Sequence, residues 1–176
     1  MSPGIEKPFR AVVTKLMLNR STLAETVEAA KTQNKTVVFT NGCFDIVHIG
    51  HIRYLQDARA QGDVLVVGVN ADVSVRKLKG EGRPLVPELE RAEVLAALEC
   101  VDFVTLFNED TPVELIRTIR PNIHVKGGDY QPQDLPEADA VREIGGEIRI
   151  VPYTSTNTEG RSTTSLIGKI VNNSRG

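Results

Sequence analysis

Two histidines, His48 and His51, stand three residues apart in the stretch TNGCFDIVHIGH, residues 40–51. Residues at this spacing share one face of a helix, so both imidazole rings can reach the same phosphate group, and Gly50 leaves no side chain between them. An imidazole N–H donates a hydrogen bond whether the ring is neutral or charged, which suits a group that stabilises charge on phosphorus. Metal binding is the weaker interpretation, because HExxH spacing and a third ligand are absent. The pair therefore predicts phosphate chemistry and no metal site.

The segment before the histidines has the composition of a phosphate-binding turn. Gly42 can take backbone conformations closed to other residues, and exposed N–H groups in such a turn and at a helix start bind anionic oxygens. We therefore expect a nucleotide to contact Asn41, Gly42, Cys43, Phe44 and Gly50. Asp45 is a candidate for orienting a histidine or contacting the acceptor, although aspartate is also a common turn residue.

From residue 36 onward, short apolar runs alternate with stretches in which apolar residues recur every three or four positions. The predicted strands are Thr36–Thr40, Val64–Val69, Phe103–Phe107, Ile123–Lys126 and Ile148–Val151. Their nearly continuous apolarity indicates strands covered on both faces, as in a parallel sheet. We predict a doubly wound α/β fold, in which ligands bind beyond the carboxyl ends of the strands and the first βα turn contacts phosphate.

Helices are predicted between these strands and at both ends of the chain. Ile52, Leu55 and Ala58 mark a helix that stops near Gly62, and a second runs through Pro87–Glu99. Others are predicted from a capping box at Thr111 with Pro112 at the first helical position, before Gly145-Gly146, from Ser162 or Thr163 onward, and before Gln33 with Thr22 and Glu25 as its cap. We divide the chain into a helical appendage (residues 1–35), one domain (36–171) and a tail (172–176).

Three further segments carry groups that suit phosphate. Arg76, Lys77, Lys79 and Arg83 cluster around Gly80 and Gly82, as in a mobile basic loop that folds over phosphates; the alternative is a solvated charged surface. Lys126 ends the fourth predicted strand and Gly127 and Asp129 follow it, so these residues can reach the same cleft, unless they form an ordinary turn. Ser162, Thr163 and Thr164 begin the last predicted helix, where hydroxyl groups bind phosphate or cap the helix.

Composition excludes several classes of protein. The chain of 176 residues has 21 basic and 23 acidic side chains, which gives no strong attraction to nucleic acid or to an anionic membrane. Cys43 and Cys100 form no Cys/His cluster, and no secretory signal or apolar run of membrane-spanning length is present. We expect a cytoplasmic protein without nucleic-acid or membrane partners, in which Arg91, Asp102 and the cysteines are structural.

The stretch TNGCFDIVHIGH is similar to the signature of the cytidylyltransferase-like nucleotidyltransferases, which include glycerol-3-phosphate cytidylyltransferase. LKGEGRP (78–84), VKGGDY (125–130) and EGRSTTSLI (159–167) resemble most closely the adenylyltransferases that act on D-glycero-β-D-manno-heptose 1-phosphate in lipopolysaccharide biosynthesis. The resemblance covers roughly residues 35–171. It implies transfer of AMP from ATP to that sugar phosphate, with release of pyrophosphate.

The resemblance also implies roles for individual residues. His48 and His51 would contact the α- and β-phosphates during an in-line attack without a covalent enzyme intermediate. Lys79 is preferred over Lys77 as a phosphate-binding lysine, Arg83 is a substrate candidate, and Mg²⁺ or another divalent ion would accompany ATP. Related cytidylyltransferases carry an arginine where this chain has Asn157, so a phosphate contact there is not expected.

For partners, the resemblance implies ATP and a sugar phosphate as small-molecule substrates, a separate sugar kinase upstream, and a homo-oligomer. The alternative in the same class is a CTP-dependent cytidylyltransferase acting on glycerol 3-phosphate or another small phosphorylated alcohol. An alternative of another class is a non-catalytic nucleotide-binding module. A dinucleotide-dependent dehydrogenase is set aside, because the first turn lacks the G-x-G-x-x-G pattern.

Overall fold

The computed structural model describes residues 14–128, 131–151, 167–168 and 173, and these form one α/β unit around a parallel sheet. The strands are β1 (Val37–Gly42), β2 (Val64–Asn70), β3 (Phe103–Phe107), β4 (Ile123–Gly127) and β5 (Glu147–Val151). Their order is β3-β2-β1-β4-β5, and all pairings are parallel. The predicted fold and all five predicted strands are confirmed, with ends that differ by at most two residues.

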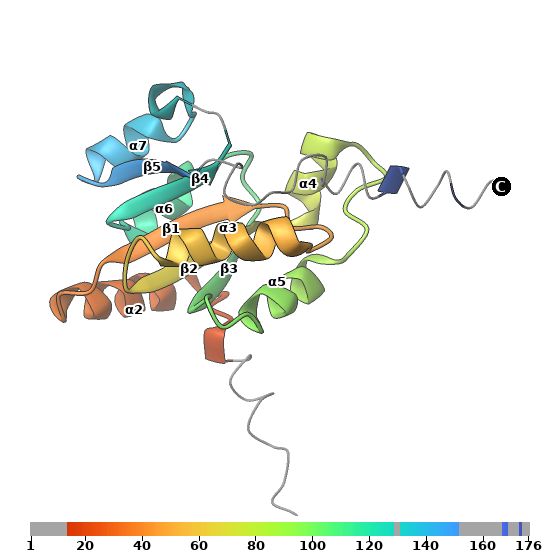
Figure 1. Ribbon diagram of the computed structural model, residues 1–176. Coiled ribbons are helices and arrows are strands. Elements are labelled where there is room, and N and C mark those ends of the chain that lie inside the picture. The colour runs from red at the N-terminus through yellow and green to blue at the C-terminus, as the bar shows by residue number, and fades with distance from the viewer. Residues whose placement is uncertain (1–13, 129–130, 152–166, 169–172, 174–176) are drawn as a thin grey trace, which may run out of the picture.

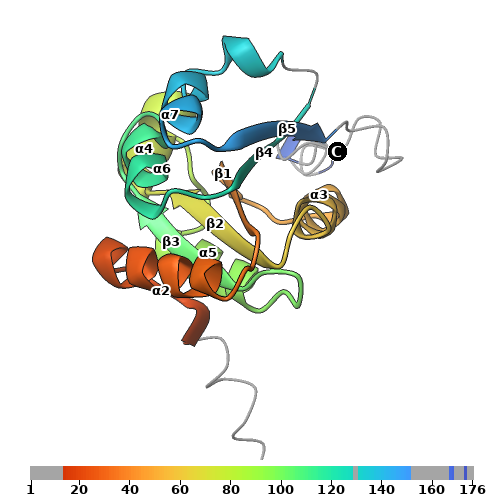
Figure 2. The ribbon, with the colours of Figure 1, turned by 90° about the vertical axis from the view of Figure 1, so that its left-hand side faces the viewer.

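Helices cover both faces of the sheet (Figure 1). On one face, α3 (Ile49–Arg59) and α5 (Glu88–Ala96) pack over a core that includes Leu55 and Leu95. On the other, α2 (Arg20–Thr32), α6 (Val113–Ile119) and α7 (Ala138–Glu143) pack over Phe39 and Ile116. Figure 2 shows the two layers, with α2 and α6 on one side of the sheet and α3 on the other. A short 3-10 turn, η1 (Pro132–Asp134), precedes α7.

The strand order places a switch point at the centre of the sheet. β1 pairs with β2 on one side and with β4 on the other, so the chain leaves β1 in one direction and later returns to its opposite side. The carboxyl ends of β1 and β4 therefore flank the crevice in which such folds bind ligands. The turn that follows β1, with His48 and His51, lies at this crevice.

Three local predictions need correction. Residues 76–79 were expected in a mobile loop, but they belong to α4 (Asp72–Lys79), which is anchored by the fully buried Val75. α2 is capped by the side chain of Asn19, which accepts hydrogen bonds from the N–H groups of residues 21 and 22, and not by Thr22. α6 begins after Pro112 without a side-chain cap, so the capping box predicted at Thr111 does not form.

The remaining helix predictions at the ends of the chain are tested only in part. α2 ends at Thr32, next to the predicted end near Gln33, and it buries Leu23 and Val27 in the core. Of the predicted last helix, only Ile167 and Gly168 lie within the described residues, and both are helical. The division into residues 1–35, 36–171 and 172–176 stays a prediction.

Candidate phosphate-binding site

His48 and His51 both take part in starting helix α3. His48 is the N-cap, and its Nδ1 accepts a hydrogen bond from the Gly50 N–H at 3.2 Å. The Nδ1 atom of His51 in turn accepts from the His48 N–H at 3.4 Å, which completes a capping box. A side chain at each position thus satisfies a backbone N–H that the first helical turn leaves without a partner.

These hydrogen bonds assign the protons of both rings. A ring nitrogen accepts a hydrogen bond only when it carries no proton, so each neutral ring holds its proton on Nε2, at its outer edge. The two rings stack, with centroids 4.0 Å apart and an interplanar angle of 29°. Burial, and to a lesser extent the charge of His48, lowers the pKa of His51 to about 4. At neutral pH His51 is therefore an uncharged hydrogen-bond donor.

Phe44 supports the His51 ring from the preceding turn. Its backbone has a φ of 47°, in the left-handed region that non-glycine residues rarely adopt, and its side chain is buried. The ring stands edge-on to His51, with centroids 5.4 Å apart, and lies close over Gly42, where an added Cβ would meet it at 3.0 Å. Unfavourable backbone conformations of this kind persist only where the surroundings hold them, and they concentrate at binding sites.

Asp45 ties the turn to the segment after α4. Its buried carboxylate accepts hydrogen bonds from Arg83 Nε and from the N–H groups of Leu85 and Val86. Burial alone would raise the pKa of Asp45, but these hydrogen bonds outweigh it and lower the pKa. The carboxylate contacts seen in the described structure thus hold Arg83 beside the turn and do not join Asp45 to either histidine.

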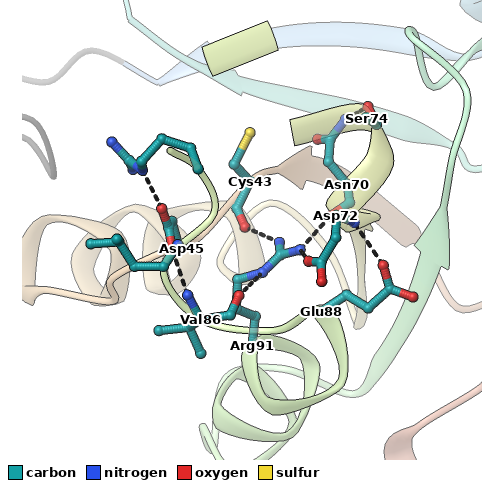
Figure 3. A network of polar contacts seen from close by, with 10 residues as sticks. Cys43, Asp45, Asn70, Asp72, Ser74, Val86, Glu88 and Arg91 are labelled. Atoms are coloured by element: carbon teal, nitrogen blue, oxygen red, sulfur yellow. Dashed lines mark hydrogen bonds and ion pairs between the residues drawn. The ribbon is translucent and has the colours of Figure 1, made fainter. Parts of the chain in front are cut away.

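Arg91 of α5 fastens several segments at the carboxyl edge of the sheet (Figure 3). Its guanidinium is fully buried and donates to the carbonyl oxygens of Cys43, Asn70 and Val86 and to the carboxylate of Asp72. The first βα turn, the end of β2 and the start of α4 are therefore held by one side chain. Arg91 was predicted to be structural, and its contacts agree with that prediction.

The basic residues of the predicted loop separate into distinct groups. Lys77 of α4 pairs with Asp110 at 3.1 Å on the exposed surface. Lys79 acts electrostatically on the thiol of Cys43, whose pKa burial raises and the charge of Lys79 partly lowers. Gly80 ends α4 with a φ of 96°, and Arg83 follows it toward Asp45. Arg83 thus contacts the turn through Asp45, and the choice of Lys79 over Lys77 as the phosphate-binding lysine stays a prediction.

The end of β4 brings Lys126 to the end of β1. Lys126 Nζ donates to Asn41 Oδ1 at 3.0 Å, so two predicted nucleotide-binding side chains are in contact. Gly127 lies under the ring of Tyr54, which an added Cβ would meet at 2.9 Å, and the Tyr54 hydroxyl donates to the Val125 carbonyl oxygen. The absence of a side chain at Gly127 thus lets Tyr54 of α3 pack closely against the end of β4.

The predicted site residues Asp129, Ser162, Thr163 and Thr164 lie outside the described residues.

Within the described part of the chain, no group of three or more His, Cys, Asp or Glu side chains is placed to hold a metal ion. A hollow of about 630 Å³ lies over α4, α5 and the end of β3, lined by residues such as Val73, Arg76 and Leu89, and its lining does not include the histidines.

The geometry at the first βα turn agrees with a sequence comparison. The sequence pattern of the cytidylyltransferase-like family matches residues 39–169. The chain belongs to the cytidylyltransferase-like family. The predicted resemblance and the predicted class of enzyme, a nucleotidyltransferase, are thereby confirmed.

Individual relatives agree with this family. The chain is 52% identical over 153 residues to the bifunctional protein HldE of Geobacter metallireducens, and 53% identical over 152 residues to that of Geotalea uraniireducens. These matches cover 87% and 86% of this chain, and it spans about 30% of the length of each relative. Among solved structures, the lipopolysaccharide core biosynthesis protein of Thermoplasma volcanium has a TM-score of 0.57 and 30% identity, over 67% of this chain and 95% of that one.

A more distant structure shows the fold alone. Pantoate-beta-alanine ligase from Francisella tularensis has 13% identity and a TM-score of 0.55, and the match covers 78% of this chain and 66% of the ligase chain.

No helix in the described ranges combines the length and the apolarity needed to cross a bilayer.

Sequence reasoning missed several residues of this site. Asp72, Asn70 and Glu88 hold the start of α4, and Glu137 pairs with Lys126. A signal existed for one of them: Glu137 pairs with His124, and a histidine inside the apolar run IHV indicates a buried polar partner. The other contacts depend on how segments far apart in the chain meet.

Proposed function

We propose that this chain transfers AMP from ATP to D-glycero-β-D-manno-heptose 1-phosphate, giving ADP-heptose and pyrophosphate. The observation that carries the proposal is the pair of stacked imidazoles at the first βα turn, each with its donor proton on Nε2. The acceptor is supported by the similarity to the lipopolysaccharide core biosynthesis protein and to the HldE proteins. The choice of ATP rests on the same similarity.

In the proposed reaction, a phosphate oxygen of the sugar attacks the α-phosphorus in line. The new P–O bond forms as the bond between the α-phosphorus and the bridging oxygen breaks, and pyrophosphate leaves with the electron pair. The attacking phosphate is already an anion, so positioning and charge stabilisation matter more than a general base. His48 and His51 would donate to the α- and β-phosphate oxygens, on which negative charge grows.

Other groups would complete the triphosphate site. Lys79 and Arg83 supply positive charge beside the turn, the backbone of residues 42–44 supplies N–H donors, and Asn41 and Lys126 approach from the ends of β1 and β4. Asp129, Ser162, Thr163 and Thr164 stay predicted contacts. Mg²⁺ would come with the triphosphate, because this ion binds largely through substrate phosphates and water in such sites. A cytoplasmic location, a separate sugar kinase and a homo-oligomer stay predictions.

The proposal is tested by pyrophosphate release from the purified chain. ATP and CTP are each offered with D-glycero-β-D-manno-heptose 1-phosphate and with glycerol 3-phosphate, beside a His51→Asn control. We expect release with ATP and the heptose phosphate, and its loss in the control. Release only with CTP would keep the mechanism and overturn the substrates. ATP binding without turnover in any pairing would instead favour a non-catalytic nucleotide-binding module.

A further inference from the structure

A row of four linked polar groups lies at the ends of β4 and β1, and the proposed reaction gives no role to its two buried members, His124 and Glu137. His124 Nε2 lies 3.0 Å from Glu137 Oε1, and Lys126 Nζ lies 2.8 Å from the same oxygen. Lys126 Nζ then donates to Asn41 Oδ1 at 3.0 Å. One carboxylate thus connects a strand interior to the residue that precedes Gly42 in the phosphate-binding turn.

The protonation states of Glu137 and His124 follow from their burial. Glu137 is 1% exposed and His124 is fully buried. His124 Nε2 donates to the carboxylate, and burial lowers the pKa of His124 despite the opposing effect of Glu137, so the ring stays neutral at pH 7. Burial would raise the pKa of Glu137, but the bonds from His124 and Lys126 lower it to about 2. Glu137 is therefore an anion whose charge Lys126 balances.

Stability alone gives a weak account of this ion pair. The cost of removing two charges from water offsets most of their attraction, and apolar residues of similar volume often stabilise a fold as well. The pair has a second effect, however, on Asn41. Lys126 has only N–H donors, so the amide oxygen of Asn41 must face it, and the two N–H donors of Asn41 Nδ2 point elsewhere.

We propose that Glu137 is a positioning residue for nucleotide binding. It holds the ammonium group of Lys126, which fixes the amide of Asn41 with Nδ2 as the donor to a phosphate oxygen of the nucleotide. Glu137 itself does not touch the nucleotide. This inference rests on the proposed function only in so far as a nucleoside triphosphate binds at the turn after β1.

The test is ATP binding by calorimetry, without acceptor, together with the kinetics of pyrophosphate release. Glu137→Gln keeps the size of the side chain and removes its charge. We expect the Kd for ATP to rise about tenfold, as one hydrogen bond to a charged group would give. KM for ATP should rise similarly with little change in kcat, because binding is weakened equally in the ground and transition states.

A double-mutant cycle separates positioning from a purely structural role. Asn41→Ala should itself weaken ATP binding, and adding Glu137→Gln to it should change the Kd less than about threefold, because the two residues act through one contact. His124→Gln is the matched control on the other side of the carboxylate. It should lower the melting temperature and leave the Kd for ATP unchanged.

The possible outcomes separate a failure of the proposed function from a failure of the positioning role of Glu137. Absence of ATP binding by the wild-type chain would overturn the proposed function, which is a different failure from that of the inference. The positioning role would be overturned if the wild-type chain binds ATP and folded Glu137→Gln binds it with an unchanged Kd. It would also be overturned if the two substitutions had additive effects in the cycle. If Glu137→Gln does not fold, the apolar double variant Glu137→Met/Lys126→Met replaces it, and tight ATP binding by that variant would overturn the role as well.

Discussion

Replacing His51 with asparagine should separate its part in catalysis from its part in starting α3. Asparagine places an oxygen acceptor near the position of Nδ1, which receives the hydrogen bond of the His48 N–H, but it has no atom near Nε2. Glutamine reaches further and can restore a donor near Nε2. Alanine removes both groups.

The magnitudes follow from these two contacts. Removing one donor that stabilises transition-state charge lowers kcat by about 10² to 10³-fold. Losing a side-chain cap lowers the free energy of unfolding by about 0.5–2 kcal/mol. His51→Asn should therefore lose the activity while staying within about 0.5 kcal/mol of the wild type, whereas His51→Ala should lose activity and stability together.

The assay pairs steady-state pyrophosphate release with urea unfolding of the same preparations. His51→Gln provides the complementary variant, with partial activity and a weakened cap. If His51→Asn kept kcat within about threefold of the wild type, Nε2 would not be the catalytic donor. If His51→Ala were as stable as the wild type, the capping interaction inferred from the 3.4 Å contact would be wrong.

Two further predictions concern stability. The pKa of His51 is about 4 in the folded chain against an ordinary 6.5, so as pH falls the unfolded chain takes up a proton first. Stability is thus retained above pH 6.5 and lost between 6.5 and 4, by about 2 kcal/mol at pH 5. Urea unfolding at pH 7.5 and 5 should show this loss in the wild type in excess of that in His51→Asn; equal losses would contradict it. Arg91→Met should lower the free energy of unfolding by about 3–5 kcal/mol, because it leaves Asp72 and three carbonyl groups without their partner. The exposed Arg117→Met serves as its control and should leave the urea midpoint unchanged.

The sequence was sufficient for the fold because the strands of this sheet are covered on both faces. Runs such as residues 64–69 and 103–107 are apolar except for Thr105, and glycine or polar residues interrupt the chain between them. Position in a parallel sheet then located the phosphate-binding turn. Local chemistry and global topology agreed there, and the structure has the motif where it was predicted, between β1 and the start of α3.

The errors arose where tertiary contacts overruled local composition. The charges and glycines of residues 76–83 indicate a loop, but Val75 enters the core and Ser74 bonds to Asn70 and the Glu109 carbonyl oxygen, which holds α4 in place. Arg91 was recognised as structural, but its partners lie 5 to 48 positions away in the chain. The periodicity of apolar residues along the sequence gives no information on contacts between side chains and distant segments.

The two edges of this sheet differ in what change they can accept. Because every strand runs the same way, the turn with His48 and His51 lies at the carboxyl edge, and in the described ranges the opposite edge carries the connections that lead into the strands. Asn34, in the turn between α2 and β1, and Gly145, before β5, lie at that opposite edge. An added Cβ at Gly145 would meet nothing within 4 Å, but its φ of 75° would strain any other residue. A fluorescent label or a surface-attachment tag on an exposed neighbour of these turns, such as Lys35, would report on the enzyme from the side of the molecule away from the proposed site.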